Sequence, residues 1–127
     1  MTGKVAIISG ASRGLGAGLV TGYRRQGWAV VASARMIKPS GDPDLLTVAG
    51  DIADPETAER IVGGALGRFG RIDTLVNNAG AFISKPFTDY TATDYALAVG
   101  GFAGNLQLVL AASRYVFDTQ AERMTVI

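Results

Sequence analysis

Short apolar runs alternate with amphipathic segments along this chain. The apolar runs have the length of buried strands, and they predict strands at residues 5–8, 29–32, 45–49, 75–76 and 124–127. After the first run, Leu15, Leu19 and Tyr23 recur every four positions, which is the spacing of one helix face. The sequence therefore predicts strands and helices in alternation.

Capping residues mark the ends of the first two predicted helices. Asp54 followed by Pro55 favours the start of the second helix, because Asp caps free N–H groups and Pro is tolerated in the first turn. Gly27 and Gly70 favour the ends of the first and second helices. A loop is expected over residues 38–44, where turn-forming residues cluster.

The third helical pattern, which ends near Phe117, contains Gly100, Gly101 and Gly104. Each glycine costs a helix up to ~1 kcal/mol relative to alanine. We therefore expect this helix to have a weak or kinked start and a firmer second half.

The alternation of strands and helices predicts an α/β fold with a parallel sheet. Because crossovers between parallel strands are right-handed, we expect a Rossmann-like doubly wound sheet of about five strands in the order 3-2-1-4-5. The length of 127 residues predicts one domain over residues 1–127. In this order a crevice lies at the carboxyl ends of the first and fourth strands, where the strand order reverses.

Three glycines, Gly10, Gly14 and Gly16, fall between the first predicted strand and the first predicted helix. A helix start presents free N–H groups and the positive end of the helix dipole, which favour a pyrophosphate. Glycine allows the backbone to approach such a group closely. The alternative is a tight turn without a ligand, but the strand before and the helix after favour nucleotide binding.

Composition excludes several kinds of site and partner. The sequence has no cysteine and no histidine, which excludes disulfides, thiolate chemistry, a histidine base and a histidine metal site. The formal net charge is +1 without a basic tract, so we expect no nucleic-acid partner. No apolar stretch has the length of a membrane span or a signal peptide, so we expect no membrane association and a cytoplasmic location.

Four features resemble the short-chain dehydrogenase/reductase family in order and spacing. They are the glycine pattern Gly10-x-x-x-Gly14-x-Gly16, the pair Gly50-Asp51, the turn Asn77-Asn78-Ala79-Gly80, and the capped helix that follows. They cover nearly all of this chain but only about the first half of a typical member, which runs to ~250 residues. The resemblance implies a dinucleotide-binding domain that is apparently truncated after its fifth strand.

The resemblance implies a cofactor site built from the glycine turn and from the turns after the third and fourth strands. Its residues are Gly10, Ser12, Gly14, Leu15, Gly16, Asp51, Ile52, Asn77, Ala79 and Gly80. The glycines would carry the pyrophosphate, Ser12 would lie among the phosphates, and Leu15 would add a backbone N–H. Asp51 would accept a hydrogen bond from the adenine amino group, beside the Ile52 backbone. The residues of the last turn would line the ribose and nicotinamide side.

Structural alternatives apply to two of these assignments. Asp51 is also placed to cap the loop before Asp54, although the adenine role is favoured given the glycines. The Asn77-Asn78 pair is also a turn former that would tie adjacent strands together, and both roles are compatible.

The resemblance also identifies missing catalytic residues. The family's catalytic Asn position in the helix after the last turn is held by Gly100, and Asn105 is out of register and is not assigned. The family's Ser and Tyr-x-x-x-Lys are absent, since no Tyr here is followed by Lys four positions later. The implied function is an NADP-dependent short-chain oxidoreductase, acting on a carbonyl or alcohol, with only its cofactor-binding half present. The alternative is a non-catalytic dinucleotide-binding or assembly module, or an inactive truncated product.

The end of the second predicted strand favours NADP(H) over NAD(H). An NAD site usually places a carboxylate there to bind the ribose 2′-OH, but this sequence has Ser33-Ala34-Arg35. Arg35 is able to meet a 2′-phosphate with charge-assisted hydrogen bonds, and Arg13 in the glycine turn would approach from the other side. The alternative is two solvent-exposed arginines without a ligand.

A homo-oligomer is also expected. Residues 124–127 would form a sheet edge, and unpaired edges and apolar patches favour association. The family resemblance adds a dimer surface on the helix that carries Leu106, Leu110 and Phe117.

Overall fold

The computed structural model describes residues 3–79, 87–89, 91–119 and 124–127. Its elements are, in chain order, β1 (Val5–Ser9), α1 (Gly14–Arg25), β2 (Ala29–Ala34), β3 (Leu45–Ala49), α2 (Pro55–Phe69), β4 (Thr74–Val76), a short 3-10 helix (Phe87–Asp89), α3 (Ala92–Thr119) and β5 (Thr125–Val126). The predicted strands and helices are all present, and several boundaries move by one or two residues. Within these described ranges, no helix combines the length and apolar character of a membrane span.

The strands form one parallel sheet in the order β3-β2-β1-β4-β5, as predicted. β1 lies at its centre, with Ala6 level with Val30 of β2 on one side and with Thr74 of β4 on the other. The order therefore reverses between β1 and β4, and the turns that follow these two strands lie at the same edge of the sheet.

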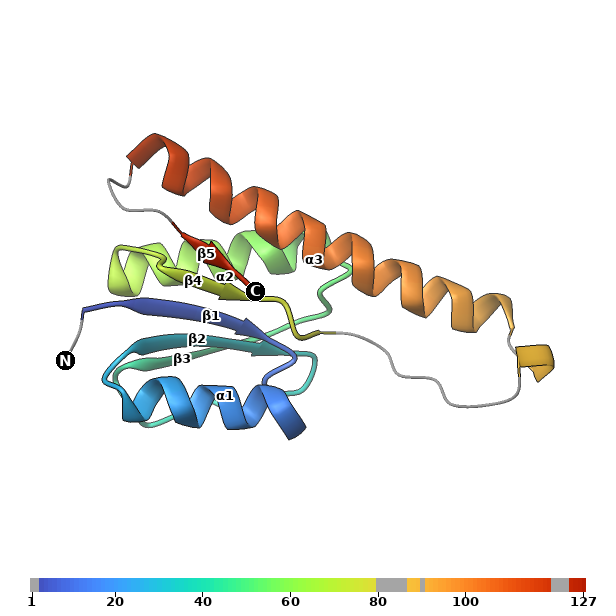
Figure 1. The fold of residues 1–127 in the computed structure, drawn as a ribbon, viewed down its shortest axis with the longest axis horizontal. Helices are drawn as coiled ribbons and strands as arrows, with labels where there is room; N and C mark the ends of the chain where they lie inside the picture. The colour runs from blue at the N-terminus through green and yellow to red at the C-terminus, as the bar shows by residue number, and fades with distance from the viewer. Residues whose placement is uncertain (1–2, 80–86, 90, 120–123) are drawn as a thin grey trace.

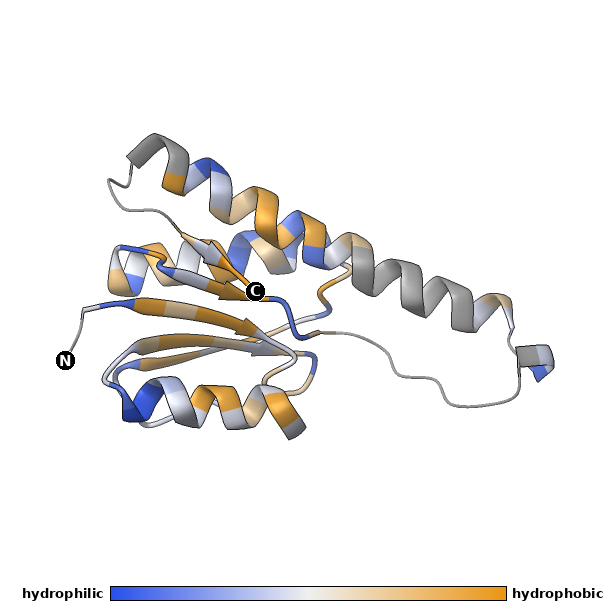
Figure 2. Cartoon of the chain, viewed as in Figure 1, coloured by the Kyte–Doolittle hydropathy of each residue, from blue (hydrophilic) through white to orange (hydrophobic). Residues whose placement is uncertain are grey.

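Helices cover both faces of the sheet, with α1 on one side and α2 and α3 on the other (Figure 1). All residues of β1 are buried, and successive side chains enter opposite layers. Ile7 packs in the cluster that contains Ile61 of α2 and Leu108 of α3, whereas Ile8 packs in the cluster with Leu19 and Val20 of α1. Figure 2 shows the resulting apolar central strands.

The predicted caps have the expected geometry. Asp54 caps α2, because its Oδ1 accepts a hydrogen bond from the Glu56 backbone N–H at 3.0 Å. Gly70 ends α2 in the left-handed region with φ 78°, and Gly27 follows α1 with φ 85°.

The third helix is one continuous element. α3 continues from Ala92 to Thr119 without an interruption at its three glycines. One reason is visible at Gly104, where a Cβ would overlap the backbone carbonyl of Ile52. This glycine allows close packing of α3, so a tertiary contact offsets its low helix propensity.

Candidate functional site

The turn after β1 requires glycine at each of its three expected positions. Gly10 and Gly14 have φ values of 63° and 60°, in the left-handed region that other residues avoid. Gly16 has an ordinary φ, but a Cβ there would overlap the Gly10 carbonyl and lie 2.7 Å from Nδ2 of Asn78. The glycines at positions 10 and 16 thus make room for neighbouring protein segments, a role that sequence reasoning did not identify.

This turn leaves the start of α1 open to a ligand. Arg13 precedes the helix in an extended conformation, and its side chain makes no capping hydrogen bond. Arg13 therefore leaves the first amides of α1 uncapped at the positive end of the helix dipole. Ser12 and Gly14 are exposed, and Leu15 is 72% exposed although it is a large apolar residue. This exposed surface has the character of an anion-binding site flanked by an apolar contact.

The turn after β4 is fixed against the glycine turn by hydrogen bonds. The hydroxyl oxygen of Ser9, at the end of β1, accepts from the backbone N–H groups of Asn78 and Ala79, each at 3.0 Å. The Asn78 amide donates to the Gly10 carbonyl at 3.1 Å. The turn-forming interpretation of this segment is therefore confirmed for Asn78. Ser9 was missed, although a polar residue that ends an apolar strand was a usable signal.

Asn77 and Ala79, which were predicted to line the ribose and nicotinamide side, belong to this same turn. The Asn77 backbone N–H donates to the Ile127 carbonyl at 2.9 Å, and its buried side-chain Oδ1 has no hydrogen-bond partner in the described part of the chain. The Ala79 carbonyl accepts from Nδ2 of Asn105 on α3 at 3.0 Å. The predicted site residue Gly80 lies outside the described residues.

Asp51 caps the loop before Asp54, which was the structural alternative to its adenine role. Its Oδ1 accepts from the Ala53 N–H, and its carbonyl accepts from the Asp54 N–H, each at 3.0 Å. The side chain is exposed, so a hydrogen bond to an adenine amino group stays a prediction. Ile52 is half-buried beside it, with its carbonyl against α3.

Arg35 lies immediately after β2. Because β2 runs parallel to its neighbour β1, the ends of the two strands lie at the same edge of the sheet as the glycine turn. The Ala11 N–H of that turn donates to the Ser33 carbonyl near the end of β2 at 3.0 Å, which joins the two segments. Arg35 and Arg13 are both exposed. Exposure agrees with binding of a 2′-phosphate and equally with two surface arginines that bind no ligand.

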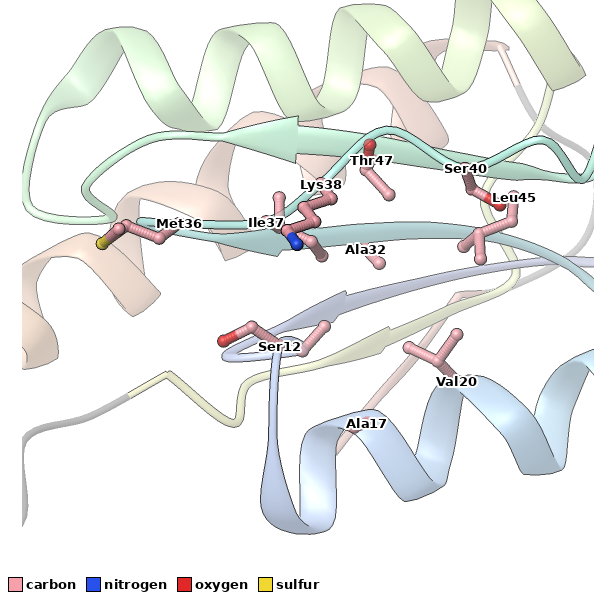
Figure 3. Close-up of a pocket in the computed structure, with 11 residues that line it drawn as sticks. Ser12, Ala17, Val20, Ala32, Met36, Ile37, Lys38, Ser40, Leu45 and Thr47 are labelled. Carbon is pink, nitrogen blue, oxygen red and sulfur yellow. The ribbon is translucent and has the colours of Figure 1, made fainter.

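A cavity of about 420 Å³ lies between the glycine turn, α1 and the connection from β2 to β3 (Figure 3). Its lining residues are Ala11, Ser12, Ala17, Val20, Ala32, Met36, Ile37, Lys38, Ser40, Leu45 and Thr47. Lys38 adds a positive charge to the lining that contains Ser12. Sequence reasoning treated residues 38–44 only as turn formers, because local composition does not reveal which helix a loop will face.

The tyrosines with described side chains do not lie in this site. The Tyr115 hydroxyl donates to the carbonyl of Gly70, which lies before β4, at 3.1 Å, and the Tyr23 ring packs against Trp28. Gly70 lies at the opposite end of the sheet from the glycine turn. In the described part of the chain, no cluster of acidic residues is arranged to hold a metal ion.

Comparisons with known proteins identify similar sequences and folds. A family model described as short chain dehydrogenase matches residues 4–124. The chain is 36% identical over 109 residues to 11-beta-hydroxysteroid dehydrogenase-like 4A of Arabidopsis thaliana, covering 78% of this chain and 36% of that protein. It is 33% identical over 119 residues to sorbitol dehydrogenase of Cereibacter sphaeroides, covering 86% of this chain and 46% of that protein.

Solved structures have the same fold. A short chain dehydrogenase from Bacillus anthracis matches with a TM-score of 0.83 and 26% identity, covering 91% of this chain and 52% of that one. L-sorbose reductase from Gluconobacter frateurii, solved with NADPH and L-sorbose, matches with a TM-score of 0.77 and 25% identity, covering 90% of this chain and 48% of that one. The chain spans about a third to a half of the length of these relatives.

Proposed function

Since this chain belongs to the short-chain dehydrogenase family, we propose that it is the dinucleotide-binding domain of an oxidoreductase. The reaction is hydride transfer between NADP(H) and a small-molecule carbonyl or alcohol. The observation that carries the proposal is the pair of turns after β1 and β4, joined by Ser9 and Asn78 beside the uncapped start of α1. A dinucleotide has one phosphate-rich half and one nicotinamide half, and two adjacent turns suit these two halves.

Each turn has a distinct task in this proposal. Backbone N–H groups at Gly14, Leu15 and Gly16 bind the pyrophosphate, and the exposed Leu15 side chain excludes water beside it. Asp51 and Ile52 hold the adenine, and Asn77, Ala79 and Gly80 orient the ribose next to the nicotinamide. When bound, the cofactor supplies the hydride donor or acceptor.

The preference for NADP(H) is supported by charge. The end of β2 carries Arg35 where an NAD site usually has a carboxylate, and Lys38 lines the cavity next to Ser12. A 2′-phosphate at this position gains charge-assisted hydrogen bonds that a 2′-hydroxyl does not. L-sorbose reductase, one of the structural neighbours, was solved with NADPH.

Calorimetric titration of the folded chain with NADPH and NADH tests this proposal. We expect NADPH to bind more tightly, and Arg35→Ala to weaken NADPH by about tenfold or more while leaving NADH nearly unchanged. Arg25→Ala, which removes an exposed positive charge at the far end of α1, is the matched control. Equal or tighter binding of NADH would contradict the preference, and no binding of either cofactor would contradict the function.

The non-catalytic alternative is favoured by the catalytic residues that are missing. The sequence has no Tyr-x-x-x-Lys pair and no histidine, so it supplies no recognised proton donor for the alkoxide. We therefore expect cofactor binding without turnover. NADPH oxidation assays with reactive ketones at high protein concentration separate the two functions, since turnover by these residues alone would exclude the binding-module alternative.

A further inference from the structure

Two consecutive residues of α3 contact both turns that follow β3 and β4. Gly104 is buried with its backbone against Ile52, and a Cβ there would also lie 3.0 Å from the Ala53 nitrogen. Asn105 donates from Nδ2 to the Ala79 carbonyl, 26 residues earlier in the chain. Sequence analysis assigned neither residue to the site. This part of α3 nevertheless links the turn after β3, where we propose that the adenine binds, to the turn after β4, where we propose that the nicotinamide half binds.

The peptide unit of Ala79 is held from two directions. Its N–H donates to the Ser9 hydroxyl, and its carbonyl accepts from Asn105. With both groups bonded, the orientation of this residue relative to β1 and α3 is fixed. Any ligand that contacts the turn therefore meets a preorganised backbone.

The packing of α3 against the rest of the fold does not by itself explain why position 105 is an asparagine. Its Oδ1 is buried and has no hydrogen-bond partner among the described residues, which costs stability that an apolar side chain of similar size would not lose. The hydrogen bond from Nδ2 to the Ala79 carbonyl offsets this cost. That bond holds the turn after β4 and adds nothing to the packing of the core.

We propose that Asn105 is a positioning residue, which fixes the Ala79 carbonyl and so sets the turn that receives the ribose and nicotinamide half of the dinucleotide. This inference rests on the proposed function. It gives α3 a role in ligand binding through a side chain that touches the site turn and does not itself touch the ligand.

The test compares a whole dinucleotide with its phosphate-rich half. NADPH and adenosine 2′,5′-bisphosphate are titrated into the wild-type chain and into Asn105→Asp, which replaces the donor by an acceptor facing the Ala79 carbonyl. We expect NADPH affinity to fall by about tenfold, while the bisphosphate changes by less than about twofold. Gln107→Glu makes the same chemical change two positions along α3 and is expected to alter neither affinity.

Asn105→Ala removes the donor without adding charge, and it is expected to give the same split if Asn105→Asp does not fold. A parallel loss of both affinities, or no loss of either, would overturn the positioning role. Failure of the wild-type chain to bind either probe would instead contradict the proposed function. Emission from bound NADPH, which reports only on the nicotinamide, should change in both Asn105 variants and not in the Gln107 variant.

Discussion

Ser9 is the residue on which the two site turns depend most directly. Its buried hydroxyl accepts two backbone N–H groups, from Asn78 and Ala79, and lies within 3.4 Å of the Val76 carbonyl to which it donates. An alanine at this position would leave two amides without their acceptor. The cost of an unsatisfied buried amide is about 1–3 kcal/mol.

We therefore predict that Ser9→Ala lowers the free energy of unfolding by about 1–3 kcal/mol and also weakens dinucleotide binding. Ser33 is level with Ser9 on β2 and is also buried, so Ser33→Ala is the matched control. Urea unfolding and cofactor titration measure the two effects. Equal losses in both variants would show that burial, rather than the bonds to the turn, determines the effect.

At this scale, sequence reasoning found residues whose identity is dictated locally. The glycines at positions 10 and 14 were predicted from their place between a strand and a helix, and the structure adds that their left-handed backbone also requires glycine. Ser9, Lys38 and Asn105 were not predicted, because their importance depends on segments far along the chain. A pattern of spacing identifies a turn, but it does not identify the side chain that holds that turn against a neighbour.

At the scale of elements, α1 is tied to the connection between β2 and β3 by an ion pair. Arg24 Nε donates to Asp42 Oδ2 at 2.7 Å, and this bond lowers the pKa of the Asp42 carboxyl below its ordinary value of 3.8. Because the folded state favours the ionised carboxylate, the contribution is complete above pH 3.8 and is lost as pH falls further.

We predict that Asp42→Asn lowers the melting temperature at neutral pH and flattens the additional loss of stability below pH 3.8. The partial exposure of both side chains keeps the effect small. Melting curves of both proteins across acid pH measure it, with Glu59→Gln on the exposed face of α2 as control. Parallel curves for wild type and Asp42→Asn would exclude a contribution from this pair.

Replacing glycines in helices distinguishes the effect of helix propensity from the effect of packing. We predict that Gly104→Ala destabilises the protein by about 1–3 kcal/mol, because the added Cβ overlaps the Ile52 carbonyl. Gly63→Ala on α2 points into open space and should stabilise by about 0.5–1 kcal/mol. Urea unfolding of both variants measures the difference, and stabilisation by Gly104→Ala would contradict the close approach of α3.

The same comparison shows what helix propensity leaves out at the third helix. Helix propensity counts only the free-energy cost of each residue in isolation. Three glycines within five positions therefore predicted a weak or kinked start. The structure has one continuous helix, and at Gly104 the close contact with Ile52 offsets the low helix propensity of glycine. The strand order, by contrast, is one of the few that right-handed crossovers allow for this sequence of elements, which is why it was predictable.

At the scale of the whole molecule, apolar side chains remain exposed on α3 and at the sheet edge. Leu106 and Leu110 are 52% and 47% exposed, and Val126 and Ile127 of the β5 edge are 47% and 64% exposed. Exposed apolar residues at helical spacing favour association, and so does the outer side of β5, which pairs with no further strand among the described residues. On these observations we propose that the chain forms the homo-oligomer expected from the sequence.

We predict that light scattering at tens of micromolar protein will show a dimer or larger species. The double change Leu106→Glu and Leu110→Glu should shift the population toward monomer, because charges on the shared face repel. Thr21→Glu, on the exposed face of α1, is the control. A clean monomer of the wild-type chain at high concentration would contradict the proposal.

The central position of β1 also has a kinetic consequence. The bond between Ser9 and the Ala79 amide joins residues separated by 70 positions, whereas β1 and β2 pair at a separation of 24 between Val5 and Ala29. Contacts that close long loops form more slowly than local ones. We therefore expect the glycine turn to acquire its β1–α1–β2 surroundings before the second turn arrives, so that a nascent chain that ends after β3 would carry only half of the site. A ligand that spans both turns recognises only the completed sheet, so its binding should retard unfolding more than it accelerates folding.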